Sequence, residues 1–194
     1  MLTKNINFKS FKLKKNNKKI KIDLKLFLKE NNMILKSLGS GYRNNYNKKI
    51  LRKFKNFFNI RVIGMGGSTL GTESIYDFLN HKIKKKFHFI NNLQPNKSSV
   101  KKKKNCVNLI VSKSGETLET ISNTNIIIKK KDKNIFITEN KKSYLLDLAE
   151  KLKAEIIYHN NYIGGRYSVL SEVGMLPAEL MGLDTKKFKQ INYL

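Results

Sequence analysis

The sequence has 194 residues, of which 40% are hydrophobic, so it can form one domain with a sizeable core and would leave a second complete domain cramped. No stretch approaches the about 18 consecutive apolar residues of a membrane-spanning helix. The Lys- and Asn-rich start lacks the features of a secretory signal or an organelle transit peptide, so by default we expect a cytoplasmic protein with no membrane partner. The single Cys106 opens the apolar run CVNLIV and is interpreted as a small buried hydrophobic residue.

The charge is strongly positive, with 40 Lys and Arg against 14 Asp and Glu and a formal net charge of +26. Such an excess can attract nucleic acid or an anionic membrane. Nearly all of it is Lys, however, and it accompanies abundant Asn and Ile, which is the pattern that A/T-rich codons produce. The basic runs at 101–104 and 129–131 are not interleaved with aromatic residues, so no nucleic-acid partner is expected. A positive surface would still help to attract an anionic substrate.

The first 58 residues are expected to form a basic lead-in followed by helices. Residues 1 to about 20 are structurally weak. Residues 23–38 place apolar side chains at helical spacing, and the pattern ends at Gly39, a residue typical of helix ends. A second amphipathic stretch covers about 46–58. These helices are expected to pack on a face of the domain that follows.

From Ile60 onward, short apolar runs alternate with helix-like stretches. The expected strands are 61–64, 87–90, 107–111, 134–138 and 155–158, and the expected helices are 68–80, 118–130 and 143–152. Near-continuous apolar strands separated by helices indicate a parallel sheet that is covered on both faces. We therefore predict a doubly wound α/β fold with a five-stranded parallel sheet of the flavodoxin-like kind, in which ligands bind beyond the carboxyl ends of the strands. The segment 94–105 is left unassigned.

The first expected strand is followed by GMGGSTLG, residues 64–71. Its glycines allow a sharp turn and a close approach to a ligand, and Ser68 and Thr69 stand where a helix begins. Alone this is a weak signal, because many Gly-rich turns between a strand and a helix are only tight turns. The segment lacks the Lys of a P-loop, and its glycine spacing does not fit a dinucleotide fingerprint.

The third expected strand is followed by SKSGETLET, residues 112–120. Ser112, Ser114 and Thr117 supply three hydroxyls around Gly115 at an expected helix N-terminus, which suits a phosphate monoester. The alternative is an ordinary N-cap with a Glu in the first turn of the helix. A single hydroxyl would be enough for such a cap, so the pattern favours a phosphate site.

The fifth expected strand is followed by GGRYSVLSEVGMLPAELMGLD, residues 164–184. Gly164 and Gly165 free the backbone before Arg166, so a buried guanidinium can be directed into the crevice at the strand ends. There it could hold substrate oxygens or stabilise a developing enediolate. A structural Arg paired with a carboxylate fits the spacing equally well.

Taken together, GMGGSTLG, SKSGETLET and IGGRYSVLSEVGMLP, in this order and at these intervals, resemble the N-terminal half of the glucose-6-phosphate isomerase (phosphoglucose isomerase) family. The bacterial members are the best match. The middle motif marks the wider sugar-isomerase (SIS) domain family, whereas GGRYSV is close to a signature of the isomerase itself. The resemblance covers about residues 60–184, and the preceding helices are compatible with it.

The resemblance implies a glycolytic and gluconeogenic enzyme that interconverts glucose 6-phosphate and fructose 6-phosphate with no metal and no organic cofactor. The site residues that it implies are Ser112, Lys113, Ser114 and Thr117 for the phosphate, Gly66, Gly67, Ser68 and Gly165 for the sugar, and Arg166 as the catalytic residue that stabilises the enediolate. Glu116 stands where other members often carry Thr. It is expected to point outward, because an acid beside a phosphate is costly.

The family mechanism also requires a Glu base, a His that assists ring opening and a late Lys. Family members carry these in a second SIS domain and a C-terminal segment, with the His contributed by the partner subunit of a homodimer, and no residue here matches those positions. The remaining candidates are interpreted as solvated or capping residues (Glu172, Glu179), a turn residue (Asp184) and structural histidines (His81, His88, His159). Residues 59–194 are thus expected to form one SIS domain, with the second absent.

Two interpretations remain open for the function. The first is an N-terminal fragment of a glucose-6-phosphate isomerase that has little or no activity alone. The second is a non-catalytic sugar-phosphate-binding module that acts as a sensor or as one subunit of a larger assembly. An amino-sugar isomerase domain is disfavoured by GGRYSV.

Overall fold

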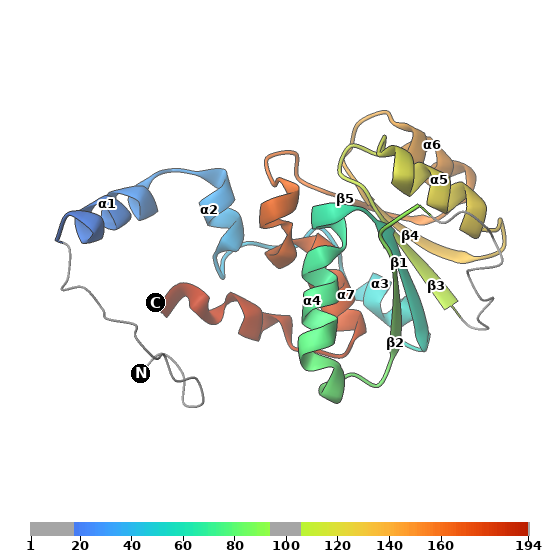
Figure 1. Ribbon diagram of the computed structural model, residues 1–194, viewed down its shortest axis with the longest axis horizontal. Helices are drawn as coiled ribbons and strands as arrows, with labels where there is room; N and C mark the ends of the chain where they lie inside the picture. Colours follow the sequence, from blue (N-terminus) through green and yellow to red (C-terminus); the bar gives the residue numbers. More distant parts are fainter. Residues whose placement is uncertain (1–17, 94–105, 194) are drawn as a thin grey trace.

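The computed structural model describes residues 18–93 and 106–193 of the chain (Figure 1). Most of the expected lead-in and the unassigned segment 94–105 therefore lie outside the described residues. Within the described parts of the chain, no helix is both long and apolar enough to cross a membrane.

A single parallel sheet forms the centre of the structure. Its strands are β1 (Asn59–Gly64), β2 (Lys86–Ile90), β3 (Cys106–Val111), β4 (Lys133–Thr138) and β5 (Glu155–Tyr158). They lie in the order β2-β1-β3-β4-β5, and Ile60 of β1 is in register with Phe87 on one side and Val107 on the other. β1, β3 and β4 are buried almost throughout, as apolar strands covered on both faces must be. The predicted fold class and all five predicted strands are confirmed.

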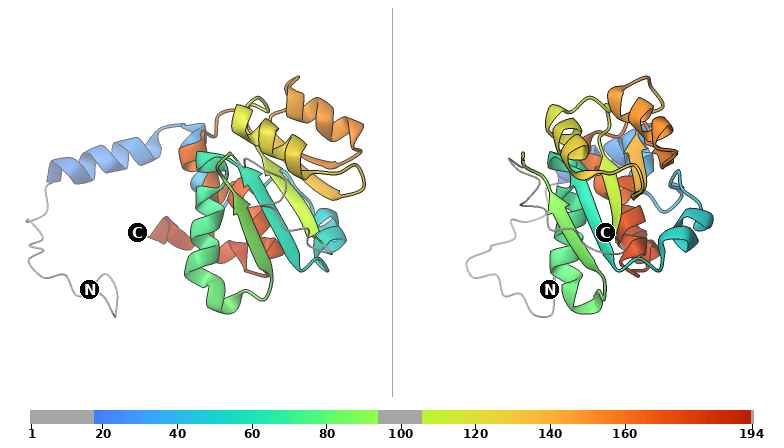
Figure 2. Two further views of the ribbon diagram at one scale, coloured as in Figure 1. Left: turned by 45° about the vertical axis from the view of Figure 1, so that its right-hand side comes forward. Right: turned by 90° about the vertical axis from the view of Figure 1, so that its right-hand side faces the viewer.

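Helices cover both faces of the sheet (Figure 2). The long helices after β1 are α4 (Leu70–Leu79), α5 (Leu118–Ile127), α6 (Tyr144–Lys151) and α7 (Glu172–Leu180). From β1 the chain passes through α4 to β2 on one side, whereas β3, β4 and β5 follow one another on the other side through α5 and α6. Because crossovers between parallel strands are right-handed, this reversal places α4 on the opposite face from α5 and α6.

Two hydrophobic cores fill the space between the sheet and its helices. The larger core lies on the face covered by α4 and α7 and includes Val62, Leu109 and Met175. The smaller core lies under α5 and α6 and includes Ile110 and Phe136. α7 is buried along almost its whole length, which explains why its sequence EVGMLPAEL is mostly apolar. Short 3-10 helices connect the larger elements: η1 (Gly66–Ser68), η2 (Asn80–Lys82), η4 (Gly165–Leu170) and η5 (Thr185–Tyr193).

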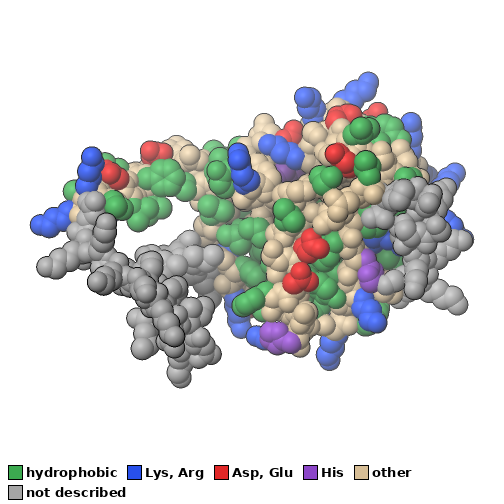
Figure 3. Space-filling model, viewed as in Figure 1, with side chains coloured by type: hydrophobic (Ala, Val, Ile, Leu, Met, Phe, Trp, Pro, Cys, Tyr) green, Lys and Arg blue, Asp and Glu red, His purple; other side chains and the backbone are tan. Residues whose placement is uncertain are grey.

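The N-terminal helices differ in part from the prediction. The stretch expected to form one helix over 23–38 is divided into α1 (Lys18–Lys29) and α2 (Met33–Leu38). The division occurs because the side chain of Asn32 accepts a hydrogen bond from Ile34 N at 2.8 Å and so caps a new helix, which ends at Gly39 as expected. α3 (Lys48–Phe54) buries Phe54 in the larger core, whereas α1 buries no residue, and its apolar side chains are visible at one end of the molecule (Figure 3).

A proline inside α7 ties this helix to α4. Pro177 has no N–H, so the carbonyl of Val173 one turn earlier lacks its helical partner. The hydroxyl of Thr72 in α4 donates to that oxygen at 3.2 Å. This contact satisfies a buried carbonyl and fixes α4 against the helix that follows the Arg166 segment.

We expect Thr72→Val, which keeps the shape of the side chain and removes the donor, to lower the free energy of unfolding by about 1–2 kcal/mol. Urea denaturation of the purified chain measures the difference. Thr72→Ser, which keeps the hydroxyl, should lose less. No loss in Thr72→Val would show that the bond contributes nothing.

Candidate functional site

The three motifs meet at the carboxyl edge of the sheet. GMGGSTLG follows β1, SKSGETLET follows the adjacent β3, and the loop with GGRYSV follows β5. β1 and β3 are the neighbours at which the chain reverses its direction across the sheet, so their ends form the crevice where ligands of doubly wound folds bind. The loop after β5 returns to this crevice, where Gly165 comes against Gly67.

The loop after β3 brings two hydroxyls together. Ser112 is buried, and its Oγ lies 3.0 Å from the Oγ1 of Thr117. Gly115 between them has φ +68°, a left-handed conformation that favours glycine, and a Cβ there would overlap the side chain of Ser143. Ser114 is exposed, and its Oγ accepts a hydrogen bond from Glu116 N at 3.2 Å. The predicted hydroxyl loop therefore turns sharply around a glycine whose conformation and closeness to Ser143 both disfavour a side chain.

This loop leads directly into the N-terminus of α5. Thr117 is the N-cap residue, but its side chain makes no capping hydrogen bond and instead lies against Ser112. The first N–H groups of any α-helix lack partners within the helix, and the helix dipole is positive there. The loop thus presents hydroxyls and backbone N–H groups on one side, which is an arrangement suited to an anion.

The two charged side chains of the loop, Lys113 and Glu116, point in different directions. Glu116 is exposed, as predicted, and its Oε1 accepts a hydrogen bond from Tyr144 N at 2.7 Å, at the start of α6. The Nζ of Lys113 donates to the carbonyl of Asn161 and lies 3.5 Å from a carboxylate oxygen of Glu139. Lys113 therefore links the hydroxyl loop to the loop that follows β5.

Gly67 and Gly165 are packed backbone against backbone. A Cβ on Gly67 would overlap the carbonyl of Gly165, so neither a larger residue nor a looser arrangement fits at this contact. The Oγ of Ser168 lies 3.1 Å from the Gly67 carbonyl oxygen and 2.8 Å from that of Gly165, and so joins the two segments. Gly67 and Gly165, which the sequence suggested would line a ligand, thus also allow the loops after β1 and β5 to pack against each other. Ser68 lies in η1, and α4 begins two residues later.

Arg166 lies in η4 and is exposed, so the expectation of a buried guanidinium was wrong. It borders an open groove of about 710 Å³ whose other walls include Leu70 and Phe78 of α4 and Phe188 of η5. Among the residues that the structure describes, no carboxylate forms an ion pair with it. Neither of the two expected arrangements, buried or paired, is therefore present, and the side chain extends from η4 toward solvent.

A small cavity connects the three segments beneath the surface. It has a volume of about 20 Å³, enough for about one water molecule, and its polar lining comes from Ser68, Lys113, His159 and Ser168. Ser68 belongs to the first motif, Lys113 to the second and Ser168 to the third. His159, which ends up beside all three, was not among the predicted site residues.

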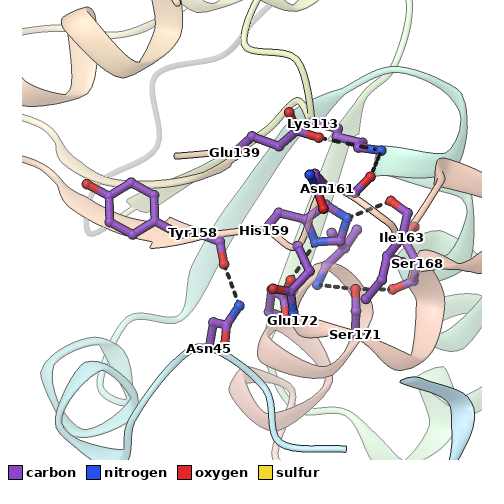
Figure 4. Close-up of polar contacts among 12 residues, drawn as sticks. Asn45, Lys113, Glu139, Tyr158, His159, Asn161, Ile163, Ser168, Ser171 and Glu172 are labelled. Carbon is purple, nitrogen blue, oxygen red and sulfur yellow. Dashed lines mark hydrogen bonds and ion pairs between the residues drawn. The ribbon is translucent and has the colours of Figure 1, made fainter. Parts of the chain in front are cut away.

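A buried ion pair lies next to this cavity, and sequence reasoning missed it. The Nδ1 of His159 lies 2.5 Å from the Oε1 of Glu172, and the two side chains are 2% and 0% exposed (Figure 4). Glu172 is therefore neither solvated nor a cap, contrary to the prediction. His159 is a buried histidine whose structural role is its ion pair with Glu172. The Oε2 of Glu172 accepts a hydrogen bond from the hydroxyl of Tyr42 at 3.1 Å.

The surroundings keep Glu172 ionised. Burial by itself would raise the pKa of this carboxyl group, but hydrogen bonds from His159, from its own backbone N–H and from Tyr42, with the positive charge of His159, hold the pKa below its ordinary value of 4.5. Burial and the nearby Glu172 raise the pKa of Tyr42, so its hydroxyl remains a donor. The carboxylate thus has one side-chain donor on each of its oxygens.

The other acids and histidines considered from the sequence do not contact the His159–Glu172 pair in any of the hydrogen bonds described for them. Glu179 is half-buried, not solvated, and its Oε1 accepts hydrogen bonds from the hydroxyls of Tyr46 and Thr185, both at 2.9 Å. Asp184 accepts from Lys186 N at 3.1 Å, as a turn residue does. His81 is exposed in η2, and His88 lies in β2. Within the described ranges, no group of three or more His, Cys, Asp or Glu residues could hold a metal ion.

Solved structures with this fold are known. A hypothetical protein from Thermus thermophilus superposes with a TM-score of 0.65 at 22% identity, covering 87% of this chain and 44% of that one. The tagatose-6-phosphate ketose/aldose isomerase of Escherichia coli superposes with a TM-score of 0.58 at 14% identity, covering 80% of this chain and 48% of that one. At these identities the likeness shows the fold alone. The chain is therefore a doubly wound α/β domain with the fold of these structures, and its motifs lie at the carboxyl edge of the sheet.

The sequence comparisons are more specific. Residues 14–191 match the family model of phosphoglucose isomerase, and the chain belongs to this family. It is 37% identical to the glucose-6-phosphate isomerase of Methanocaldococcus jannaschii over 161 residues, which are 76% of this chain and 39% of the relative. It is 34% identical to that of Acholeplasma laidlawii, over 72% of this chain and 37% of the relative. The chain therefore spans about two fifths of the length of these relatives.

Proposed function

We propose that this chain is the sugar-phosphate-binding SIS domain of a glucose-6-phosphate isomerase, which interconverts glucose 6-phosphate and fructose 6-phosphate. The observation that carries the proposal is the meeting of the Ser112–Thr117 hydroxyl pair and the Gly67–Gly165 contact at the switch point of the sheet. Membership of the phosphoglucose isomerase family supports it. In this proposal residues 59–194 form the SIS domain, the complete enzyme is a cytoplasmic homodimer, and no cofactor takes part.

The phosphate group of the substrate would occupy the hydroxyl loop. Ser112, Ser114 and Thr117 would donate to its oxygens, together with the first N–H groups of α5. The dianion would lie at the positive end of the helix dipole, with the ammonium of Lys113 close by. Glu116 does not oppose this charge, because its carboxylate is engaged at the start of α6.

The sugar carbons would extend from the phosphate toward Gly66, Gly67, Ser68 and Gly165, with the guanidinium of Arg166 at the far end. Isomerisation moves a proton between C1 and C2 of the open-chain sugar and passes through an enediolate. Arg166, which is exposed and without a carboxylate partner among the described residues, would be free to bind the negative charge that develops on the oxygen atoms.

The general base remains to be supplied by a part of the enzyme other than the described residues. Glu172 is fully buried and holds His159, so neither side chain is available to substrate in this arrangement. We therefore expect the chain alone to bind sugar phosphates with little or no turnover. The alternative, a non-catalytic sugar-phosphate-binding module, would use the same phosphate loop without any need for Arg166.

Calorimetric titration of the purified chain with fructose 6-phosphate tests the phosphate loop. Removing a hydroxyl that donates to a charged phosphate costs about 1.5–3 kcal/mol, so Ser114→Ala and Ser112→Ala should each weaken binding roughly 10- to 100-fold. Ser74→Ala, an exposed serine of α4 outside the hydroxyl loop, is the matched control and should bind as the parent does. Absence of binding by the folded parent chain would refute the proposed function.

A second titration separates the isomerase from the non-catalytic module. A 5-phospho-sugar acid that mimics the enediolate should bind more tightly than fructose 6-phosphate if the site serves isomerisation, and Arg166→Ala should remove that preference. Equal affinities for the two ligands, unaffected by Arg166→Ala, would favour the module. Turnover by the chain itself would show that a base among its own residues has been overlooked.

A further inference from the structure

The contacts of His159 and Glu172 reach beyond their mutual ion pair. The Nε2 of His159 lies 3.1 Å from the carbonyl oxygen of Ile163, while its Nδ1 faces Glu172. Both ring nitrogens therefore face acceptor oxygens, and the imidazole lies between the Glu172 carboxylate and the Ile163 carbonyl.

The chain folds around this ring. His159 N donates to the Thr138 carbonyl at 2.8 Å and so fixes the start of the loop on the sheet. Four residues later the Ile163 carbonyl returns to the same imidazole, and the side chain of Ile163 is fully buried. Between them, the carbonyl of Asn161 accepts from Lys113. Side chains therefore hold the loop from 159 to 163 at two of its carbonyls: Lys113 at Asn161 and His159 at Ile163 (Figure 4).

The segment that follows this loop carries two of the residues assigned to the substrate. Gly165, assigned to the sugar, and Arg166 come one and two residues after Gly164, and Gly165 is the residue packed against Gly67. On the other side of the pair, Glu172 lies in the first turn of α7, immediately after η4. The ion pair thus joins the two ends of the segment that carries Arg166, with His159 before it and Glu172 after it.

Resting on the proposed function, we propose that His159 and Glu172 are positioning residues for the isomerase site. The imidazole bridges Glu172 and the Ile163 carbonyl and so clamps the segment 159–172 into the shape that presents Gly165 and Arg166 to the sugar end of the substrate. The pair does not touch the phosphate itself, whose loop is built by β3 and α5. Its loss should therefore weaken recognition of the sugar more than recognition of phosphate.

The charged and titratable groups that face the pair come from three parts of the chain. They are Lys113, which lines the same cavity as His159, Tyr42, whose hydroxyl donates to Glu172 and accepts from the neutral amide of Asn160 at 2.9 Å, and Lys189 of η5, whose ammonium donates to the Tyr42 carbonyl at 3.2 Å. Of these, Tyr42 supports the carboxylate form of Glu172. Lys189 contributes a second positive charge nearby.

The test compares two ligands in calorimetric titrations of His159→Gln and the parent chain. We expect the affinity for fructose 6-phosphate to fall about tenfold or more, while the affinity for inorganic phosphate stays within about twofold. His81→Gln, a change at an exposed histidine in η2, is the matched control and should leave both affinities unchanged. A fall in both affinities together, in a folded variant, would contradict a role confined to the sugar end, and no fall in either would overturn the proposal.

A graded pair of substitutions at Glu172 covers the case in which His159→Gln does not fold. Glu172→Gln keeps an acceptor oxygen for the imidazole and should retain more affinity for fructose 6-phosphate than Glu172→Leu, which removes it. Equal affinities of the two Glu172 variants for fructose 6-phosphate would overturn the proposal. Because the parent chain's own binding of fructose 6-phosphate is measured first, failure of the proposed function is distinguishable from failure of the positioning role.

Discussion

Gly67→Ala is expected to weaken the binding of fructose 6-phosphate by about tenfold or more and to lower the free energy of unfolding by about 1–3 kcal/mol. The added Cβ would overlap the carbonyl carbon and oxygen of Gly165, which are backbone atoms and cannot rotate away. The two loops would have to separate, and the hydroxyl of Ser168, which joins both carbonyls, would lose at least one of its contacts. Calorimetry and urea denaturation of the same preparation measure the two effects.

Gly164→Ala is the matched control for this substitution, because it adds the same methyl group one residue from Gly165. A Cβ on Gly164 would meet only the ring of Tyr167, at the ordinary contact distance of 3.8 Å. This variant should bind and unfold as the parent chain does. If Gly67→Ala also behaved as the parent chain, the close backbone contact between the two motifs would not be part of the site.

His159→Leu is expected to lower the free energy of unfolding by about 3–5 kcal/mol. The substitution leaves the carboxylate of Glu172 fully buried, with the Tyr42 hydroxyl as the one side-chain donor described for it. A buried charge without its partner is costly, whereas an apolar pair of similar size is not. Urea denaturation at pH 7 measures the loss.

The double variant His159→Leu with Glu172→Leu separates the ion pair from simple packing. Because it removes both charges together, it should recover roughly half or more of the stability that His159→Leu loses. If the losses of the two single variants simply added, the two side chains would not be coupled. The contact between His159 Nδ1 and the Glu172 carboxylate would then contribute nothing to the free energy of unfolding.

Much of the fold could be predicted from the sequence, because the strands are short, continuous apolar runs, which is the pattern of parallel strands buried on both faces. The run Val107–Val111 is an example: it is buried on both faces and is followed by a polar loop and a helix. The local geometry of the hydroxyl loop at 112–117 could be anticipated for a similar reason. Its hydroxyls, glycine and helix start are neighbours along the chain, so their arrangement depends on local geometry alone.

The features that were missed depend on contacts between distant segments. His159 and Glu172 are 13 residues apart with an irregular loop between them, and Tyr42 lies 130 residues from Glu172. No periodic pattern relates such positions, and a Glu at the start of a helix ordinarily lies at the surface. The one available signal was that SEVGMLPAEL is otherwise apolar, which indicates a buried helix and hence a partner for any charge on it.

Arg166 and the N-terminal helix show two further limits. The exposure of Arg166 depends on how η4 lies against α4, which the Gly-Gly-Arg sequence does not determine. The apolar spacing over 23–38 continues through Asn31 and Asn32, yet the Asn32 side chain competes successfully for a backbone N–H and starts a new helix. Local capping chemistry thus outweighed the periodicity of the apolar residues.

Hydrogen exchange of the 194-residue chain, with and without fructose 6-phosphate, tests most directly whether the three motifs form one site. We predict that the ligand slows amide exchange in peptides covering 64–71, 112–120 and 159–168 together, and that Ser114→Ala removes the protection in all three. Protection of none of these segments, or of the α4 and η5 groove instead, would contradict a sugar-phosphate site at the switch point of the sheet.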